Sequence, residues 1–274
     1  MQSPPYRFLR LTSPESAMGE VKLYIILVHT GFMTTNMQKK ISIALKILWL
    51  GSSLPLLLSR PVWAQVCTEA EIKTNIEKLS NVNINSVQQA ALDAVINCGS
   101  QSLQPLIVAL QDQTADIEIR GSSAFALGQI GSGSQEAVNS LIAALQEQQA
   151  DPYVRRQAAS ALGKIGAGST EAINALIAIL EEETANPYLR GDAASALGKI
   201  RAGSPAIKTL ITTLKKQKTD ARIGSPVASA LGKIGSGSIE EINALIDVLQ
   251  DQKADAKVRR SAAVALGEIG STLD

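Results

Sequence analysis

A five-residue block, Ala-Leu-Gly-x-Ile, recurs five times in the second half of this chain at almost constant spacing. The copies begin at Ala126, Ala161, Ala196, Ala230 and Ala265, so the successive intervals are 35, 35, 34 and 35 residues. A period of this size is typical of proteins built from stacked copies of one supersecondary unit. The repetition alone predicts a stacked array, and such arrays bind their partners along an extended surface more often than in an enclosed pocket.

The unit from Asp151 to Glu183 indicates what each copy forms. The apolar residues within Tyr153–Ile165 fall on one helical stripe, and those within Ile173–Leu180 form a second stripe. Gly166 between them is suited to end the first helix, because glycine adopts the left-handed conformation without a Cβ clash. Each copy is therefore predicted to be a helix–turn–helix, and the copies must stack to bury their stripes.

A glycine lies inside the first helix of every unit. These glycines are Gly128, Gly163, Gly198, Gly232 and Gly267. Glycine in a helix interior costs roughly 1 kcal/mol relative to alanine, so its recurrence needs a packing reason. We expect a close approach of the backbones of neighbouring helices at this column.

An acidic or amide residue precedes each first helix, and in most units an arginine follows four residues later. The pairs are Asp116 and Arg120, Asp151 and Arg155, Asn186 and Arg190, and Asp255 and Arg259. The acid or amide is suited to cap the helix. The arginine is predicted to reach the aspartate of its own or the adjacent unit and form a ladder along the stack. The alternative is a row of arginines that binds anionic ligands.

The unit has a consensus that is carried by three segments. It reads Asp-x-x-(Val/Ile/Leu)-Arg, then Ala-x-Ala-Leu-Gly-x-Ile-Gly, then Ala-(Val/Ile)-x-x-Leu-Ile-x-x-Leu. This consensus resembles the HEAT-like repeats first described in phycobilisome lyases, over residues 87–270. The resemblance implies an all-α fold, an α-solenoid formed as a superhelix of stacked HEAT-like helix pairs. Such repeats occur in lyases, hydroxylases and non-catalytic scaffolds, so the resemblance implies a fold rather than an activity.

Composition changes sharply near residue 65 and divides the chain into four parts. Lys39 and Lys40 precede an apolar run over residues 41–58, and Val62 and Ala64 fit a small-residue cleavage site before Gln65. This order predicts a signal peptide over residues 37–64, and an uncleaved membrane anchor is the alternative. Residues 1–36 are then an upstream extension and Met37 the true start. Residues 65–86 are predicted to form a capping helix, and residues 87–274 the array of about five helix pairs plus a closing helix.

The predicted signal peptide indicates export to the periplasm or cell envelope, with no stable membrane span after cleavage. The only two cysteines, Cys67 and Cys98, lie near the start of the mature chain. In an oxidising compartment they are expected to form one disulfide that joins the capping helix to the first unit. Two buried thiols are the alternative.

The mature chain lacks histidine, and its only two cysteines are expected to be bridged. Residues 65–274 hold 19 basic and 23 acidic residues, a net charge of −4, which argues against a nucleic-acid partner. The single histidine, His29, precedes the cleavage site, and the mature aromatic residues are Phe125, Tyr153 and Tyr188. We therefore assign no catalytic, cofactor-binding or metal-binding residue, and we expect no cofactor.

The fourth unit departs from the others and carries a local basic cluster. The interval that enters it is 34 residues, and the cluster consists of Lys208, Lys215, Lys216 and Lys218. One interpretation is a neutral deletion with drift around it. The other is a local change in stacking that presents these lysines to an acidic partner.

The sequence therefore favours a monomeric, non-catalytic scaffold in the cell envelope or periplasm that binds another protein along the concave face of the solenoid. The alternative is a phycobilin lyase-like protein or a chaperone of phycobilisome assembly. The repeat resemblance supports this alternative, and the signal peptide argues against it because that assembly is cytoplasmic.

Overall fold

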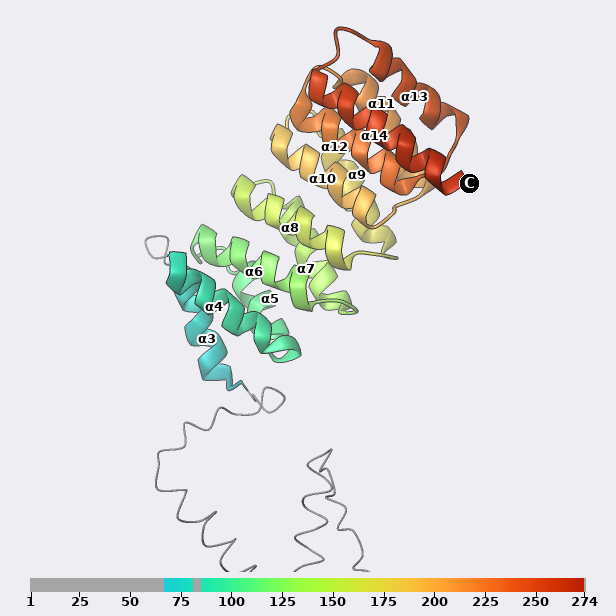
Figure 1. Cartoon of the computed structure of the whole chain (residues 1–274). Coiled ribbons are helices and arrows are strands. Elements are labelled where there is room, and N and C mark those ends of the chain that lie inside the picture. The colour runs from blue at the N-terminus through green and yellow to red at the C-terminus, as the bar shows by residue number, and fades with distance from the viewer. Residues whose placement is uncertain (1–66, 81–84, 274) are drawn as a thin grey trace, which may run out of the picture. The chain divides into compact units, whose positions relative to one another are not determined.

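The computed structural model describes residues 67–80 and 85–273, and every regular element in these ranges is a helix (Figure 1). The chain divides into two units, Met1–Gln65 and Val66–Asp274, and the described residues all belong to the second. The predicted upstream extension (1–36) and signal peptide (37–64) lie outside the described residues.

The described helices follow one another as short segments joined by tight turns. They are α3 (Glu69–Glu77), η3 (Lys78–Ser80), α4 (Asn85–Asn97), η4 (Gly99–Ser102), α5 (Leu103–Gln111), α6 (Ile117–Ile130), α7 (Gln135–Gln146), α8 (Pro152–Ile165), α9 (Thr170–Glu181), α10 (Pro187–Lys199), α11 (Ser204–Lys216), α12 (Ala221–Ile234), α13 (Ile239–Gln250) and α14 (Ala256–Leu273). From α4 onward they alternate between the first and the second helix of a pair, and α14 follows the last pair.

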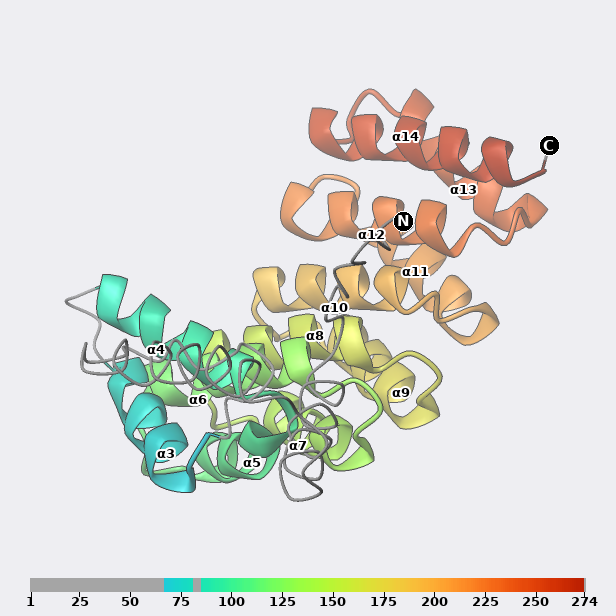
Figure 2. The same cartoon turned by 60° about the horizontal axis from the view of Figure 1, so that its bottom comes forward.

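The helix pairs stack into two layers. The first helices α6, α8, α10, α12 and α14 lie side by side in one layer, and α7, α9, α11 and α13 lie in the other (Figures 1 and 2). Each helix contacts the helix of the same layer in the next pair, and each second helix also contacts the first helix of the next pair. This arrangement confirms the expected all-α solenoid.

Side-chain caps set the starts of most helices. The Asp151 carboxylate accepts a hydrogen bond from the Tyr153 N–H at 2.7 Å and begins α8. The Ser169 hydroxyl accepts one from the Ala172 N–H at 3.1 Å and begins α9. These bonds satisfy backbone N–H groups that have no partner within the helix. Helix α11 has Gly203 at its cap, without such a bond, so the turn of this pair differs as the sequence deletion suggested.

The core runs continuously between the two layers. The leucine of the repeated block is fully buried in four successive first helices, as Leu127, Leu162, Leu197 and Leu231. Leucines of the second helices face them from the other layer, and these include Leu141, Leu176, Leu210 and Leu245, which are also fully buried. Because neither layer buries its apolar stripe alone, the core depends on every pair being stacked on its neighbours.

The glycine column lies where neighbouring first helices come closest. A Cβ at Gly163 would be 2.9 Å from the Ala196 Cα, and a Cβ at Gly128 would be 2.8 Å from the Ala161 Cα. Real Cβ atoms essentially never approach backbone atoms this closely. The predicted backbone approach is therefore present, and glycine is the residue that permits it.

The array begins with a helix that is joined to the first pair by a disulfide. Helix α3 starts with a Thr68–Glu71 capping box, in which each side chain bonds to the backbone of the other residue. Cys67 and Cys98 form a disulfide with a Cα–Cα distance of 5.7 Å. The bridge ties the start of α3 to the end of α4, so the first helix of the array is held covalently.

Two glycines of the column provide a matched test of the backbone contact. We expect Gly163→Ala to lower the free energy of unfolding by about 1–3 kcal/mol, because the new methyl group meets backbone atoms of α10. Gly267 occupies the same repeat position in α14, yet a Cβ there would meet no atom within 4 Å. Gly267→Ala is therefore expected to raise the free energy of unfolding by up to about 1 kcal/mol through helix propensity. Urea unfolding of both variants measures this, and changes of the same sign would contradict the proposed contact.

Removing the disulfide should weaken the N-terminal end of the array. In the chain-entropy model, a closed loop with a sequence separation of 31 residues contributes about 3–4 kcal/mol. We therefore expect the double variant Cys67→Ser, Cys98→Ser to unfold at a lower urea concentration than the oxidised protein. Thiol titration of denatured, non-reduced protein is expected to find no free thiol. Two reactive thiols there, with unfolding unchanged in the variant, would show that the bridge does not form.

Candidate functional site

The regular spacing of the arginines along the chain places them at the junctions between helix pairs. Arg120, Arg155 and Arg190 are 7, 8 and 6% exposed, near the starts of α6, α8 and α10. Their Nε atoms donate to the carbonyl oxygens of Leu110, Leu145 and Leu180 at 3.0, 2.9 and 3.0 Å. Each arginine thus satisfies a carbonyl at the C-terminal end of the preceding second helix, where a positive charge is also favoured by the helix dipole.

The ion pairs of these arginines differ from the ones expected from the sequence. The Arg120 Nη2 atom bonds to Glu147 at 2.5 Å, and the Arg155 Nη2 atom bonds to Glu182 at 3.1 Å. Each glutamate lies 27 residues after its arginine, just beyond the end of the next second helix. The ladder therefore forms with these glutamates in place of the expected aspartates.

The acid or amide of each expected pair has a different part in the structure. Asp151, Asn186 and Asp255 cap helices by accepting backbone N–H groups two residues later, at 2.7, 2.9 and 2.7 Å. Asp116 occupies the same cap position without a side-chain bond to the backbone. None of the four forms an ion pair with the arginine that follows it in the described structure. For Asp151, Asn186 and Asp255, the reason is that capping directs the carboxylate or amide toward the helix start.

The arginine ladder is interrupted after its second rung. The repeat position of Glu147 and Glu182 is occupied by Lys216 in α11 and by Asp251 after α13. Arg190 consequently has no carboxylate partner among the described residues.

The two units that follow Arg190 also lack the arginine–glutamate pair of the earlier units. Gly224 stands in place of the next arginine, and Asp251 pairs with Lys218 at 2.5 Å. The hydrogen bond from Lys218 holds the pKa of Asp251 below its usual range. At the last position, the Nε atom of Arg259 is buried without a hydrogen-bond partner in the described structure.

The predicted lysine cluster is not one continuous patch of unpaired charge. Lys216 pairs with Glu183 at 3.3 Å, and Lys218 pairs with Asp251. Lys208 and Lys215 are exposed, and no ion pair within the described ranges involves either of them. All four lysines lie on α11 or in the turn after it, but only two present unmatched charge.

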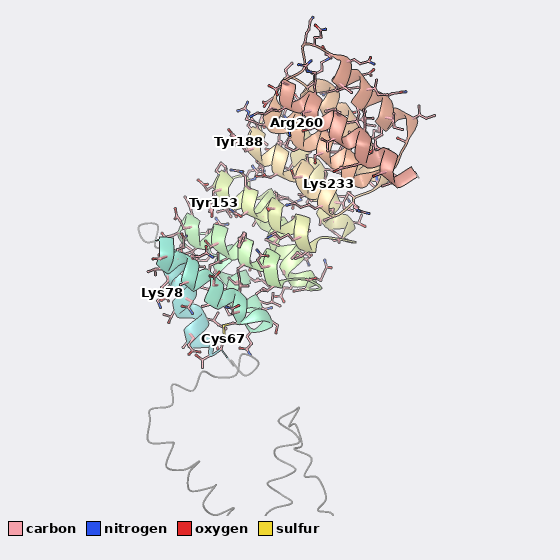
Figure 3. All side chains as sticks on the ribbon, viewed as in Figure 1. Cys67, Lys78, Tyr153, Tyr188, Lys233 and Arg260 are labelled. Atoms are coloured by element: carbon pink, nitrogen blue, oxygen red, sulfur yellow. A yellow bond between two sulfur atoms is a disulfide. The ribbon has the colours of Figure 1, made fainter. Side chains whose placement is uncertain are left out.

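The layer of first helices exposes an aromatic surface that the sequence did not single out as a binding site. We define the aromatic surface as Tyr153, Tyr188, Phe125, Arg156 and Arg222. Tyr153 and Tyr188 begin successive first helices and lie along the same edge of the array (Figure 3). They are 40 and 53% exposed, although tyrosine rings carry a large apolar area.

Cations and neighbouring helices hold these rings in place. The guanidinium carbons of Arg156 and Arg222 lie 5.4 and 5.8 Å from the centre of the Tyr188 ring, one from each adjacent first helix. Such distances are within the range of cation–π attraction. The Tyr153 ring packs against Gly121 and occupies the space that a Cβ there would need. Both rings are therefore exposed but fixed, which lowers the entropy lost on binding.

Acidic residues orient the two cations. Arg156 bonds to Asp192 at 2.7 Å, and Arg222 bonds to Asp220 through two nitrogens at 3.0 and 2.8 Å. The hydrogen bond from Arg222 lowers the pKa of Asp220, and the same bond raises the pKa of Arg222. Asp220 also caps α12, so one carboxylate fixes both a helix start and the arginine over Tyr188.

A shallow hollow of about 340 Å³ borders Tyr153 and Phe125. The Lys164 ammonium lies 4.7 Å from the centre of the Phe125 ring, on the same layer of helices. Burial lowers the pKa of Lys164, and the nearby charge of Lys199 adds to this effect. The aromatic surface thus extends over four successive first helices, α6, α8, α10 and α12.

Glu241 is a buried carboxylate that sequence reasoning missed. It stands where the other units have Ala137, Ala172 and Ala206, and it is fully buried. Its Oε2 atom accepts bonds from the Ser236 hydroxyl at 2.6 Å and the Gly237 N–H at 3.0 Å, whereas Oε1 has no partner in the described structure. The bonds draw the turn before α13 around the carboxylate, so we read Glu241 as structural. The signal for it was an acidic residue in a column of alanines.

The described ranges hold no group of three or more histidine, cysteine, aspartate or glutamate side chains placed to bind a metal ion. Within residues 67–80 and 85–273, no helix is both long and apolar enough to cross a membrane. The features that the described structure does offer are the aromatic surface and the interrupted arginine ladder.

Comparisons with known proteins bear on the family. The sequence profile of HEAT repeats matches residues 103–198 and 175–267. Among solved structures, human deoxyhypusine hydroxylase in complex with glycerol is similar, with 18% identity over 74% of this chain and 96% of that chain and a TM-score of 0.29. No curated protein matches the chain. Because the profile covers more than half of the sequence, the chain belongs to the HEAT repeat family.

Proposed function

We propose that this chain is a non-catalytic scaffold that binds another protein through the aromatic surface on its layer of first helices. The observation that carries this proposal is the pair of exposed, fixed tyrosines, Tyr153 and Tyr188, with arginines on both sides of the Tyr188 ring. Tyrosine and arginine are enriched at protein interfaces and among the residues that dominate binding energy.

The proposed surface lies on the side toward which the array bends. The first helices approach one another through glycine and alanine, such as Gly163 and Ala196, whereas the second helices of successive pairs touch less extensively. A layer with closer spacing forms the inner side of a curved stack. We therefore place the concave face on the layer of first helices, and this face carries Tyr153 and Tyr188.

We further propose that the protein works outside the cytoplasm, in the periplasm or cell envelope. The order of residues before Gln65 supports export through a cleaved signal peptide. Two lysines, Lys39 and Lys40, precede the apolar run over 41–58, and the small residues Val62 and Ala64 follow it. The Cys67–Cys98 disulfide supports the same compartment, because such bonds persist in oxidising environments.

A second candidate function is that of a phycobilin lyase-like protein or a chaperone of phycobilisome assembly. The hollow of about 340 Å³ beside Phe125 and Tyr153 favours it, since these rings could stack on a flat ligand. The absorbance of a free linear tetrapyrrole, titrated with the protein, tests this candidate. A spectral shift that is absent from a Tyr153→Ala variant would support it over the scaffold.

Site-specific photocrosslinking tests the scaffold directly. With p-benzoylphenylalanine at position 188, we expect a covalent adduct with one partner protein in envelope extract. The same group at Val108, which is exposed on α5 in the other layer of helices, is the matched control and should give no adduct. Adducts from position 108 alone, or the same adducts from both positions, would contradict the proposed surface.

Truncation of the tyrosines should weaken binding without unfolding the array. We expect Tyr188→Ala to weaken capture of the crosslinked partner by about thirtyfold, the equivalent of about 2 kcal/mol for an interface hot spot. Urea unfolding should change little, because the ring lies on the surface. Unchanged capture by a folded Tyr188→Ala variant would remove this residue from the interface.

A further inference from the structure

Arg190 is a buried cation whose usual partner has been replaced by another cation. Arg120 and Arg155 occupy the same repeat position and pair with Glu147 and Glu182. Lys216 stands at the corresponding position of the next pair, so the acid is missing there. The Nε atom of Arg190 still donates to the Leu180 carbonyl at 3.0 Å, which fixes the guanidinium in place. Its remaining N–H groups have no carboxylate among the described residues.

These free N–H groups border a hollow of about 440 Å³, which we call the Arg190 pocket. The equivalent hollow at Arg120 measures only about 200 Å³, and Glu147 lines it. In the Arg190 pocket, the Lys216 ammonium lies 3.3 Å from Glu183, an exposed residue at the rim. Because the lysine pairs outward, the space filled by a glutamate in the earlier pairs stays open.

Polar side chains line the pocket where the earlier unit has smaller groups. The residues that line the two hollows can be aligned along the chain. In this alignment Thr209, Thr212 and Thr213 occupy the repeat positions of Ser140, Ala143 and Ala144. Two alanines are thus replaced by threonines, which add hydroxyl groups beside the buried guanidinium. Lys208 also lines the pocket, and it has no ion pair in the described structure.

The acids near the pocket are already engaged. The Glu181 Oε1 atom accepts a hydrogen bond from the Thr209 hydroxyl at 3.0 Å, and Glu183 pairs with Lys216. Asp220 is close enough for the charge of Arg190 to lower its pKa, although the bond from Arg222 has the larger effect. Its carboxylate accepts two bonds from that arginine. None of these acids is paired with Arg190, so the buried charge remains open to an external anion.

We propose that the Arg190 pocket binds the carboxylate of an aspartate or glutamate side chain supplied by a bound protein. The guanidinium of Arg190 would donate to it as Arg155 donates to Glu182, while the Lys208 ammonium and the Thr213 hydroxyl complete its shell. A carboxylate is favoured over a phosphate because the same site in the two preceding units holds a carboxylate. The inference rests on the proposed scaffold function in one respect, because the acidic side chain is supplied by a bound protein.

Binding of fluorescein-labelled hexaglutamate to the full chain, followed by fluorescence anisotropy, tests the pocket. We expect Arg190→Gln to weaken binding about tenfold or more, because the charge-assisted bonds are lost. Lys216→Glu should weaken it to a similar extent, because the new glutamate restores the rung and occupies Arg190. The matched control is Lys78→Glu, which makes the same charge change on an exposed residue of η3 and should stay within about twofold of the wild type.

A stability measurement separates occupation of the pocket from misfolding. Lys216→Glu is expected to raise the urea midpoint, since a buried arginine gains its acid. Hexaglutamate should raise the midpoint of the wild type and leave that of Lys216→Glu unchanged. The proposal would be overturned if Lys216→Glu bound hexaglutamate as tightly as the wild type, or if Lys78→Glu weakened binding as much as Lys216→Glu does. It would also be overturned if the wild type bound inorganic phosphate more tightly than hexaglutamate, or failed to bind hexaglutamate at millimolar concentration. None of these results would affect crosslinking at position 188, so the two proposals fail separately.

Discussion

The contact between a glycine of one first helix and an alanine of the next determines how the helix pairs stack. At Gly128, Gly163, Gly198 and Gly232 a methyl group would meet the backbone of the adjacent helix at 2.7–2.9 Å. The backbones of neighbouring first helices are therefore in direct contact at these glycines. Because of this contact, one helix pair can shift little along its neighbour. The leucine core, the arginine junctions and the alignment of the tyrosines all depend on this register.

The same register explains how the array tolerates buried arginines. Arg155 reaches back to the Leu145 carbonyl and forward to Glu182 of the following second helix, so it joins two helix pairs. A buried cation without an acid is costly, and the unit that contains Arg190 keeps the cation after losing the acid. The next unit departs in the opposite sense, because Gly224 stands in place of the arginine while Asp251 stands at the acid position and pairs with Lys218. Retention of Arg190 beside Lys216 and Lys208 is what points to a ligand.

Sequence periodicity predicted the helix pairs and the close approach at Gly163, because each depends on contacts at a fixed offset within or between units. The Cys67–Cys98 bridge was expected on other grounds, because these are the only two cysteines and they follow a predicted signal peptide. It did not predict which acid meets each arginine, since Glu147 and Glu182 reach Arg120 and Arg155 only after the pairs have stacked. Reading the repeat as columns would have shown Glu147, Glu182, Lys216 and Asp251 at one position. The exposure of Tyr188 depends on its angle around the helix relative to both neighbours, which the apolar stripe alone did not define.

Native-state amide hydrogen exchange tests most directly whether the glycine–alanine layer governs the stack. If it does, the amides around Gly163 and Gly198 should exchange only through large-scale opening, and those of the second helices α9 and α11 should exchange at lower opening free energies. If contacts within the layer of second helices governed the stack instead, the amides of α9 and α11 would exchange at the higher opening free energies. Rapid local exchange around Gly163 and Gly198, with α9 and α11 protected, would therefore contradict the account.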